Sequence, residues 1–293
     1  MVPLGLLAEI RLMKIGNFEL SSIETGRFAL DGGAMFGIVP WVFWSKTNVP
    51  DERNRITLAA RCLLLTGNGR VILVDNGNGS KWSDKLKDIY RLDNTEYDLD
   101  KSLRRRGISA DDVTDVILTH LHFDHCGGST KITNGKAVPV FRNATYYVQR
   151  DHWNLSLRPT EKDRGSFMSE DYAVLNESGM LHFVEGEKEL FPGVQLLVCN
   201  GHTSAQQLPL ISDGVTTVLF CCDLVPTASH IPLPYIMGYD VRPLITLEEK
   251  KRILPSAEKK GWILFLEHDP ENEAVTLKAT EKGFAVDKTL RLE

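Results

Sequence analysis

The sequence predicts an α/β fold built from two similar halves, with helices outside two central sheets. Each half contains a β-hairpin, then a segment with helical spacing of apolar residues, then a short apolar strand. This repeated order is typical of sheets that are covered by helices. The chain has 293 residues, of which 42% are hydrophobic, so it is long enough to bury a large core. This length suits one large domain or two small ones, and we predict a single domain that spans residues 1–293.

The first half contains strands, a tight turn and helices in that order. Alternating or apolar runs predict the strands, and GNG supplies the hairpin turn at 67–69. Ser109 and Asp112 have the spacing of a capping box, which opens a helix or turn. The predicted elements are strands at 18–26, 56–65 and 70–77, helices at 83–90 and 99–106, and a strand at 116–118.

The second half repeats this order. Its hairpin turns at Ser212-Asp213-Gly214, and its helix precedes a final apolar strand. The predicted elements are strands at 145–149 and 194–203, a hairpin at 207–223, a helix at 247–261 and a strand at 262–269.

Two stretches interrupt the pattern. Residues 31–50 contain Gly and Pro together with large apolar groups, which predicts an aromatic loop that covers something hydrophobic. Residues 151–172 are mixed, charged and aromatic, and we interpret them as a connector between the halves.

Composition and charge narrow the class of partner. A net charge of −5 and a pI near 5.9 provide no basic field for nucleic acid or anionic lipid. The first residues lack the basic segment and cleavage site of a signal peptide, and no apolar run reaches the roughly 18 residues of a membrane span. The five cysteines are odd in number and lie mostly in strand-like runs, which favours reduced, buried thiols and a cytoplasmic location.

The stretch THLHFDH at 119–125 follows the apolar run VIL and holds three of the eight histidines of the chain. His120 and His122 are two residues apart at a strand end, and Asp124 and His125 follow in a turn. A divalent ion needs about three or four such ligands. The cluster therefore predicts a metal site.

Further polar side chains follow other apolar strands. Because α/β folds place their sites at the carboxyl ends of strands, these residues are candidates for the same site. They are Asp75, His202, Asp223 and His268.

Together these motifs resemble the metallo-β-lactamase superfamily. The resemblance rests on HxHxDH at 120–125, Cys126-Gly127-Gly128, Gly201-His202-Thr203, Asp223 and the late His268, in that order. It implies a four-layer αββα sandwich with a two-metal site, usually zinc, although His and carboxylate ligands also accept Mn²⁺, Fe²⁺ or Co²⁺.

The resemblance also implies a role for each residue. The first metal would be bound by His120, His122 and His202, and the second by Asp124, His125 and His268. Asp223 would bridge the two metals. Asp75 would orient ligands without binding metal.

The implied reaction is hydrolysis. A hydroxide shared by two metals would attack a neutral ester, lactone or phosphotriester, with Asp124 and Asp223 as the catalytic carboxylates. His230, Tyr235 and Tyr239 are candidates for the acid that protonates the leaving group. Pro226 stands where quorum-signal lactonases of the superfamily carry a tyrosine, three residues after the bridging aspartate.

The aromatic loop offers two interpretations. Phe36, Trp41 and Trp44 can wall a pocket for an apolar, uncharged small molecule. Equally, they can bury themselves against the connector at 151–172 or against a second subunit in a homodimer. The loop, the run 223–230 and EHDP at 267–270 are similar to the branch of lactonases and methyl parathion hydrolases.

Alternatives stay open within the superfamily. One is a mononuclear iron oxygenase similar to persulfide dioxygenases, and another is a thioester or β-lactam hydrolase. The basic run Arg104-Arg105-Arg106 can grip phosphate, but its helical context favours a solvated face. Cys221 and Cys222 are interpreted as core residues.

Overall fold

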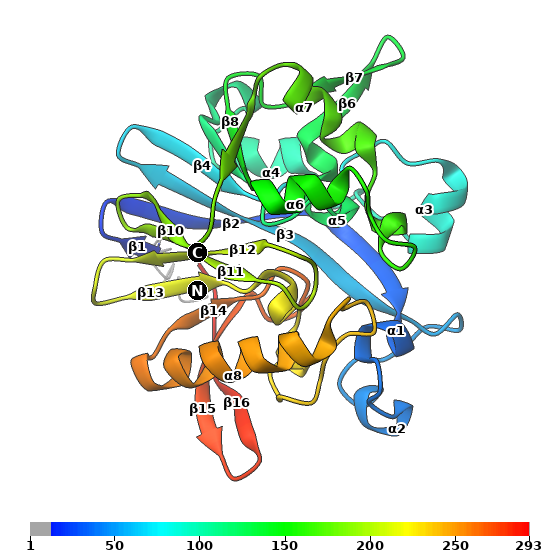
Figure 1. Cartoon of the computed structure of the whole chain (residues 1–293), viewed down its shortest axis with the longest axis vertical. Helices are drawn as coiled ribbons and strands as arrows, with labels where there is room; N and C mark the ends of the chain where they lie inside the picture. Colours follow the sequence, from blue (N-terminus) through cyan, green and yellow to red (C-terminus); the bar gives the residue numbers. More distant parts are fainter. Residues whose placement is uncertain (1–12, 293) are drawn as a thin grey trace, which may run out of the picture.

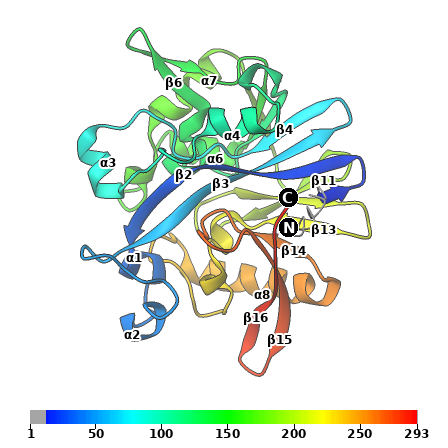
Figure 2. The same ribbon diagram turned by 180° about the vertical axis from the view of Figure 1, so that it is seen from behind.

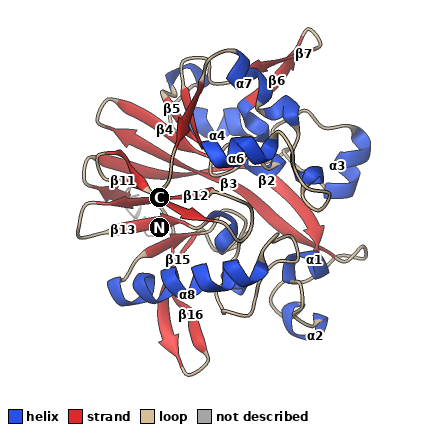
Figure 3. Cartoon of the chain, in the orientation of Figure 1, coloured by secondary structure: helices blue, strands red, loops and turns tan. Residues whose placement is uncertain are grey.

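The computed structural model describes residues 13–292 and forms two stacked seven-stranded sheets with helices outside them (Figure 1). This arrangement confirms the predicted αββα sandwich. Figure 3 shows the strands as the inner layers and the main helices as the outer ones. No helix among residues 13–292 is long and apolar enough to cross a membrane.

The first sheet has the order β1-β2-β3-β4-β5-β8-β9. Its first four strands are antiparallel neighbours, and β5, β8 and β9 continue it in parallel. The long pair β2 and β3 leads to α1 at one end of the sheet (Figure 2). The strands are β1 (Met13–Ile15), β2 (Phe18–Asp31), β3 (Arg55–Gly67), β4 (Arg70–Val74), β5 (Asp115–Ile117), β8 (Thr145–Gln149) and β9 (Leu181–Val184).

The second sheet runs in sequence order from β10 to β16, and only its pair β13–β14 is parallel. Its strands are β10 (Lys188–Phe191), β11 (Val194–Cys199), β12 (Gln206–Ser212), β13 (Thr217–Phe220), β14 (Ile263–Phe265), β15 (Ala274–Thr280) and β16 (Gly283–Leu290). A separate small hairpin consists of β6 (Thr130–Thr133) and β7 (Lys136–Pro139).

The helices lie on the outer faces. α4 packs on β2 and α6 on β8, whereas the long α8 covers β15 of the second sheet. The α-helices are α1 (Gly32–Phe36), α2 (Trp41–Trp44), α3 (Asp84–Tyr90), α4 (Leu99–Arg105), α5 (Phe123–Cys126), α6 (Arg150–Ser156), α7 (Ala173–Glu177) and α8 (Pro243–Lys260). Short 3-10 turns are at Ala110–Asp112, Gly127–Ser129, Arg164–Ser166, Ser169–Asp171, Cys222–Leu224 and Ala228–His230.

The main core lies between the two sheets. Leu63 and Val74 of the first sheet belong to one buried cluster with Leu208, Phe220 and Phe265 of the second. A second cluster packs the first sheet against its helices. Because both sheets share the inner core, the ends of their strands are held at fixed distances from one another.

The predicted capping box is present, because Ser109 and Asp112 form it before the 3-10 turn at Ala110–Asp112. The Ser83 side chain also caps α3. All five cysteines are buried and free.

Two expectations differ from the structure. Residues 31–50 are not an irregular loop, because α1 and α2 form within them. Residues 151–172 contain most of α6 and two 3-10 turns, and they connect β8 to β9 within the first sheet. The chain passes from one sheet to the other at 185–187, between β9 and β10.

Candidate metal centre

The strand ends of both sheets meet at one site. β4 and β5 are parallel, with Val74 opposite Ile117, so Asp75 and the 119–125 stretch emerge side by side. In the second sheet Phe220 lies opposite Phe265 in the parallel pair β13–β14, so Asp223 and His268 also emerge together. In each sheet, the register of a parallel pair of strands thus brings together segments that are far apart in the sequence, and the ends of both pairs meet at the site.

The first group of candidate ligands consists of three histidines. Nδ1 of His122 lies 3.0 Å from Nε2 of His120 and 3.1 Å from Nε2 of His202. Burial, followed by the neighbouring imidazoles, lowers the pKa of His120 and His122 well below the usual value. Both rings are therefore neutral at pH 7 and offer lone pairs.

The second group consists of Asp124, His125 and His268. Nε2 of His125 lies 3.2 Å from Nε2 of His268 and 3.8 Å from Oδ1 of Asp124. All three residues are buried.

Asp223 lies between the two groups. Its Oδ2 is 3.0 Å from Nε2 of His202, and its Oδ1 is 3.1 Å from Nε2 of His268. Burial opposes ionisation of this carboxyl, but the rings of His202, His125 and His268 outweigh burial and lower its pKa well below the usual value. The carboxylate is therefore charged, and its two oxygens contact both groups, with Oδ2 also 3.4 Å from Nε2 of His125.

These distances fit divalent metal ions. Ligands about 2.0–2.1 Å from a tetrahedral ion are about 3.3 Å apart, close to the spacing of the ring nitrogens. Nδ1 of His122 faces two ring nitrogens, but it carries either one lone pair or one proton, so it cannot form good hydrogen bonds to both. A cation between them resolves this conflict.

The opposite ring nitrogens meet acceptors, as is usual for metal-binding histidines. Nδ1 of His125 lies 3.1 Å from Oδ2 of Asp75, which also accepts from Thr119 Oγ1. Nδ1 of His202 lies 3.0 Å from Oδ1 of Asp240, and Nδ1 of His268 lies 2.9 Å from the Ala59 carbonyl oxygen. These contacts fix the orientation of each ring.

Three further buried residues lie near the cluster: Glu267 and His152, which were not singled out from the sequence, and Cys222, which was interpreted as a core residue. Oε2 of Glu267 lies 3.1 Å from Nδ1 of His125, and burial raises the pKa of Glu267 to about 8. Sγ of Cys222 lies 3.5 Å from Nδ1 of His120. His152, from α6, accepts from the Leu121 amide through Nε2 and faces the Ser204 carbonyl oxygen through Nδ1, both at 2.8 Å.

A cavity of about 230 Å³ opens over the cluster. Its apolar wall consists of Leu30, Met35, Leu58, Phe123 and Met237, and its polar groups include Tyr90, Tyr239, Lys162 and Ser166. Lys162 donates to the Gly238 carbonyl oxygen at 2.6 Å. That bond holds the 162–166 segment against the 237–239 segment beside the cavity.

Of the residues predicted to contact substrate, Tyr239 lines this cavity, whereas the others lie elsewhere. His230 is buried between Thr227 Oγ1 and the Met35 carbonyl oxygen, and Tyr235 lines a different pocket. Phe36 and Trp44 are buried and stacked at 5.3 Å in a separate core cluster, and Trp41 is exposed. The apolar wall instead comes mainly from aliphatic side chains of β2, β3 and α1 and from Phe123 and Met237.

Comparison with known proteins gives the family and its relatives. Residues 56–268 match the family described as the metallo-β-lactamase superfamily. N-acyl homoserine lactonase AiiA of Bacillus thuringiensis subsp. kurstaki is 33% identical over 174 residues, which is 58% of this chain and 62% of that protein. The match thus spans less than two thirds of the length of that curated relative.

Solved structures agree on the fold. A probable metal-dependent hydrolase from Staphylococcus aureus has a TM-score of 0.85 and 27% identity, and the match covers 95% of this chain and 100% of that chain. AidC, a dizinc quorum-quenching lactonase, has a TM-score of 0.80 and 21% identity, with 96% of this chain and 97% of that chain covered.

Proposed function

We propose that this chain, which belongs to the metallo-β-lactamase superfamily, is a metal-dependent hydrolase of small neutral esters or lactones. The observation that carries the proposal is the pair of ligand groups with Asp223 between them. The lactonase relatives favour a cyclic ester as substrate, with aryl esters and phosphotriesters as further candidates.

Two divalent ions fit the proposal, with zinc as the first candidate because the ligands are mostly imidazoles. His120, His122 and His202 would bind one ion, and Asp124, His125 and His268 the other, with Asp223 shared. When bound, such ions lower the pKa of water and polarise a carbonyl oxygen.

The protein's own side chains would supply the proton for the leaving group and an apolar cavity around the substrate. Burial raises the pKa of Tyr90 and of Tyr239, and nearby negative charge adds to it, from Asp124 at Tyr90 and from Asp31 at Tyr239, so both phenols are protonated at neutral pH. Because both line the cavity, we propose Tyr239, with Tyr90 beside the same carboxylate, as the donor to the leaving oxygen. Tyr239 would thus supply the phenol that residue 226 cannot supply, because residue 226 is a proline.

The size of the cavity supports a small substrate. Its volume of about 230 Å³ lies just below the roughly 300–1,000 Å³ of typical small-molecule sites, and its wall is largely apolar. A lactone with a short apolar substituent matches this space, with the Lys162 ammonium at the edge available to a polar atom of the substituent.

Metal content and turnover, measured together, test the proposal. Metal per chain would be determined by elemental analysis, and turnover of a γ-lactone, an aryl ester and an aryl phosphotriester before and after chelation. We expect about two ions and chelator-sensitive cleavage of the lactone. One iron per chain with no cleavage of any of the three would instead favour the mononuclear oxygenase.

We also propose a homodimer and a single functional domain. Ile38, Trp41, Val42, Phe43 and Val49 are exposed beside one another in the sequence, which supports a contact with a second copy. The ligands come from both sheets, which supports one domain. The buried free cysteines support a reducing compartment such as the cytoplasm.

A further inference from the structure

We infer that a second, arginine-lined pocket, distinct from the metal centre, binds a phosphate-bearing small molecule. This pocket has a volume of about 510 Å³, which lies within the roughly 300–1,000 Å³ of sites for small organic ligands. Its lining includes five arginines from four separate segments: Arg27, Arg61, Arg105, Arg106 and Arg291.

The charge of the pocket opposes that of the whole protein. Three glutamates, Glu24, Glu271 and Glu273, also line it, so its formal charge is +2, whereas the chain carries −5. A positive concavity in a negative protein concentrates small anions from solution. Guanidinium groups match phosphate oxygens in geometry as well as in charge.

The wall is held rigidly. Nη1 of Arg61 donates to the carbonyl oxygens of Leu266 and Asp269, both at 2.8 Å, and its Nε donates to Glu24 at 2.6 Å. Arg61 is only 3% exposed, so its guanidinium is a fixed part of the lining. Glu24 also pairs with Arg27, whose guanidinium stacks over the Tyr97 ring at 4.9 Å.

Other donors remain available at the opening. Within residues 13–292, no acidic group lies within salt-bridge distance of Arg105 or Arg291. The Ser22 hydroxyl is buried in the same lining and has no hydrogen-bond partner among the described residues. These groups can donate to a phosphate without breaking the Arg61 network.

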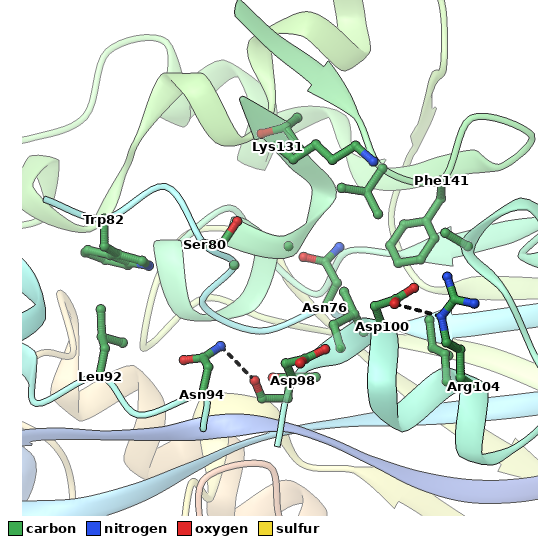
Figure 4. A pocket seen from close by; sticks show the side chains of 18 of the residues that line it. Asn76, Ser80, Trp82, Leu92, Asn94, Asp98, Asp100, Arg104, Lys131 and Phe141 are labelled. Atoms are coloured by element: carbon green, nitrogen blue, oxygen red, sulfur yellow. Dashed lines mark hydrogen bonds and ion pairs between the residues drawn. The ribbon is translucent and has the colours of Figure 1, made fainter. Parts of the chain in front are cut away.

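The three arginines of the basic run at 104–106 line two different pockets. Arg104 turns away, pairs with Asp100 at 2.8 Å and lines a separate cavity with Trp82 and Phe141 (Figure 4). Arg105 and Arg106 face the arginine-lined pocket. Arg105 and its neighbour Arg104 thus provide a lining residue and a matched control from one helix end.

Calorimetric titration of the metal-loaded protein with glycerol 3-phosphate, at fixed ionic strength, tests the inference. The double variant Arg105→Gln/Arg291→Gln should bind about tenfold more weakly or worse, because each lost guanidinium contact to phosphate weakens binding. Arg104→Gln should bind as the wild type does. Phosphate held at the metal centre would bind equally to the wild type and to the double variant, so only the difference between these two reports the arginine-lined pocket. Glu271→Gln removes a negative charge from the lining and should bind several-fold more tightly.

Absence of measurable binding by the wild type would overturn the inference, and so would equal affinity in the wild type and the double variant. Uncharged glycerol should give no heat, and equal binding of glycerol would also contradict a phosphate site. The test does not depend on hydrolysis, so a failed proposal for the metal centre leaves its outcome interpretable.

Discussion

Replacing His152 with Phe should destabilise the protein and weaken metal binding. The His152 ring is fully buried and connects two segments that carry candidate ligands, through the amide of Leu121 and the carbonyl oxygen of Ser204. Phenylalanine keeps an aromatic ring of similar size but leaves both backbone groups without a partner. Each buried group left unsatisfied costs about 1–3 kcal/mol, so we expect a loss of about 2–6 kcal/mol in the free energy of unfolding.

Equilibrium urea unfolding of the metal-loaded protein measures this loss. Because Leu121 lies between His120 and His122, and Ser204 follows His202 by two residues, the zinc dissociation constant should also rise, by about 10–100-fold. His182→Phe, at an exposed histidine, is the matched control and should change stability by less than about 0.5 kcal/mol. A His152→Phe protein as stable as that control would refute the reasoning.

Three further outcomes are expected. Burial lowers the pKa of His230 from 6.5 to about 4, so between pH 6.5 and 4 the unfolded chain binds a proton that the folded chain does not bind. The free energy of unfolding should therefore fall by up to about 3 kcal/mol as the pH drops through this window. Urea titrations of His230→Gln should lack this part of the pH dependence. Tyr239→Phe should lower kcat about 10–100-fold with little change in KM, as steady-state kinetics on a lactone can show; an unchanged kcat would exclude the phenol as proton donor. Asp223→Asn should reduce bound metal from about two ions to about one per chain by elemental analysis, because the shared carboxylate loses its charge, and two tightly held ions would argue against a bridging role.

Much of the site could be anticipated because its residues lie where strands end. His120, Asp223 and His268 each follow an apolar run, and the register of parallel strands brings those ends together. The alternation and turn signals that predicted the strands therefore also predicted the cluster. The amphipathic pattern likewise predicted α3, α4 and α8 to within a few residues.

Other groups carry no local signal. Asp240 and Lys162 lie in irregular segments, and His152 lies on a short helix whose packing decides what its ring contacts. Tyr90 reaches the cavity only because α3 folds back beside Phe123, against which its ring packs at 5.1 Å. Phe36 and Trp44 were predicted at the substrate because they are large and apolar, but stacking against each other satisfies the same tendency.

Between residues 13 and 292 the chain passes from the first sheet to the second only once, at 185–187, so a cut there would give one fragment for each sheet. A cut beside Gly186 would separate a fragment with His120, His122, Asp124 and His125 from one with His202, Asp223 and His268. Neither fragment holds all the proposed metal ligands, and each exposes one face of the shared core. Reassembly would therefore be driven by apolar burial and secured by metal, so the two pieces would form a split reporter whose signal depends on the ion supplied.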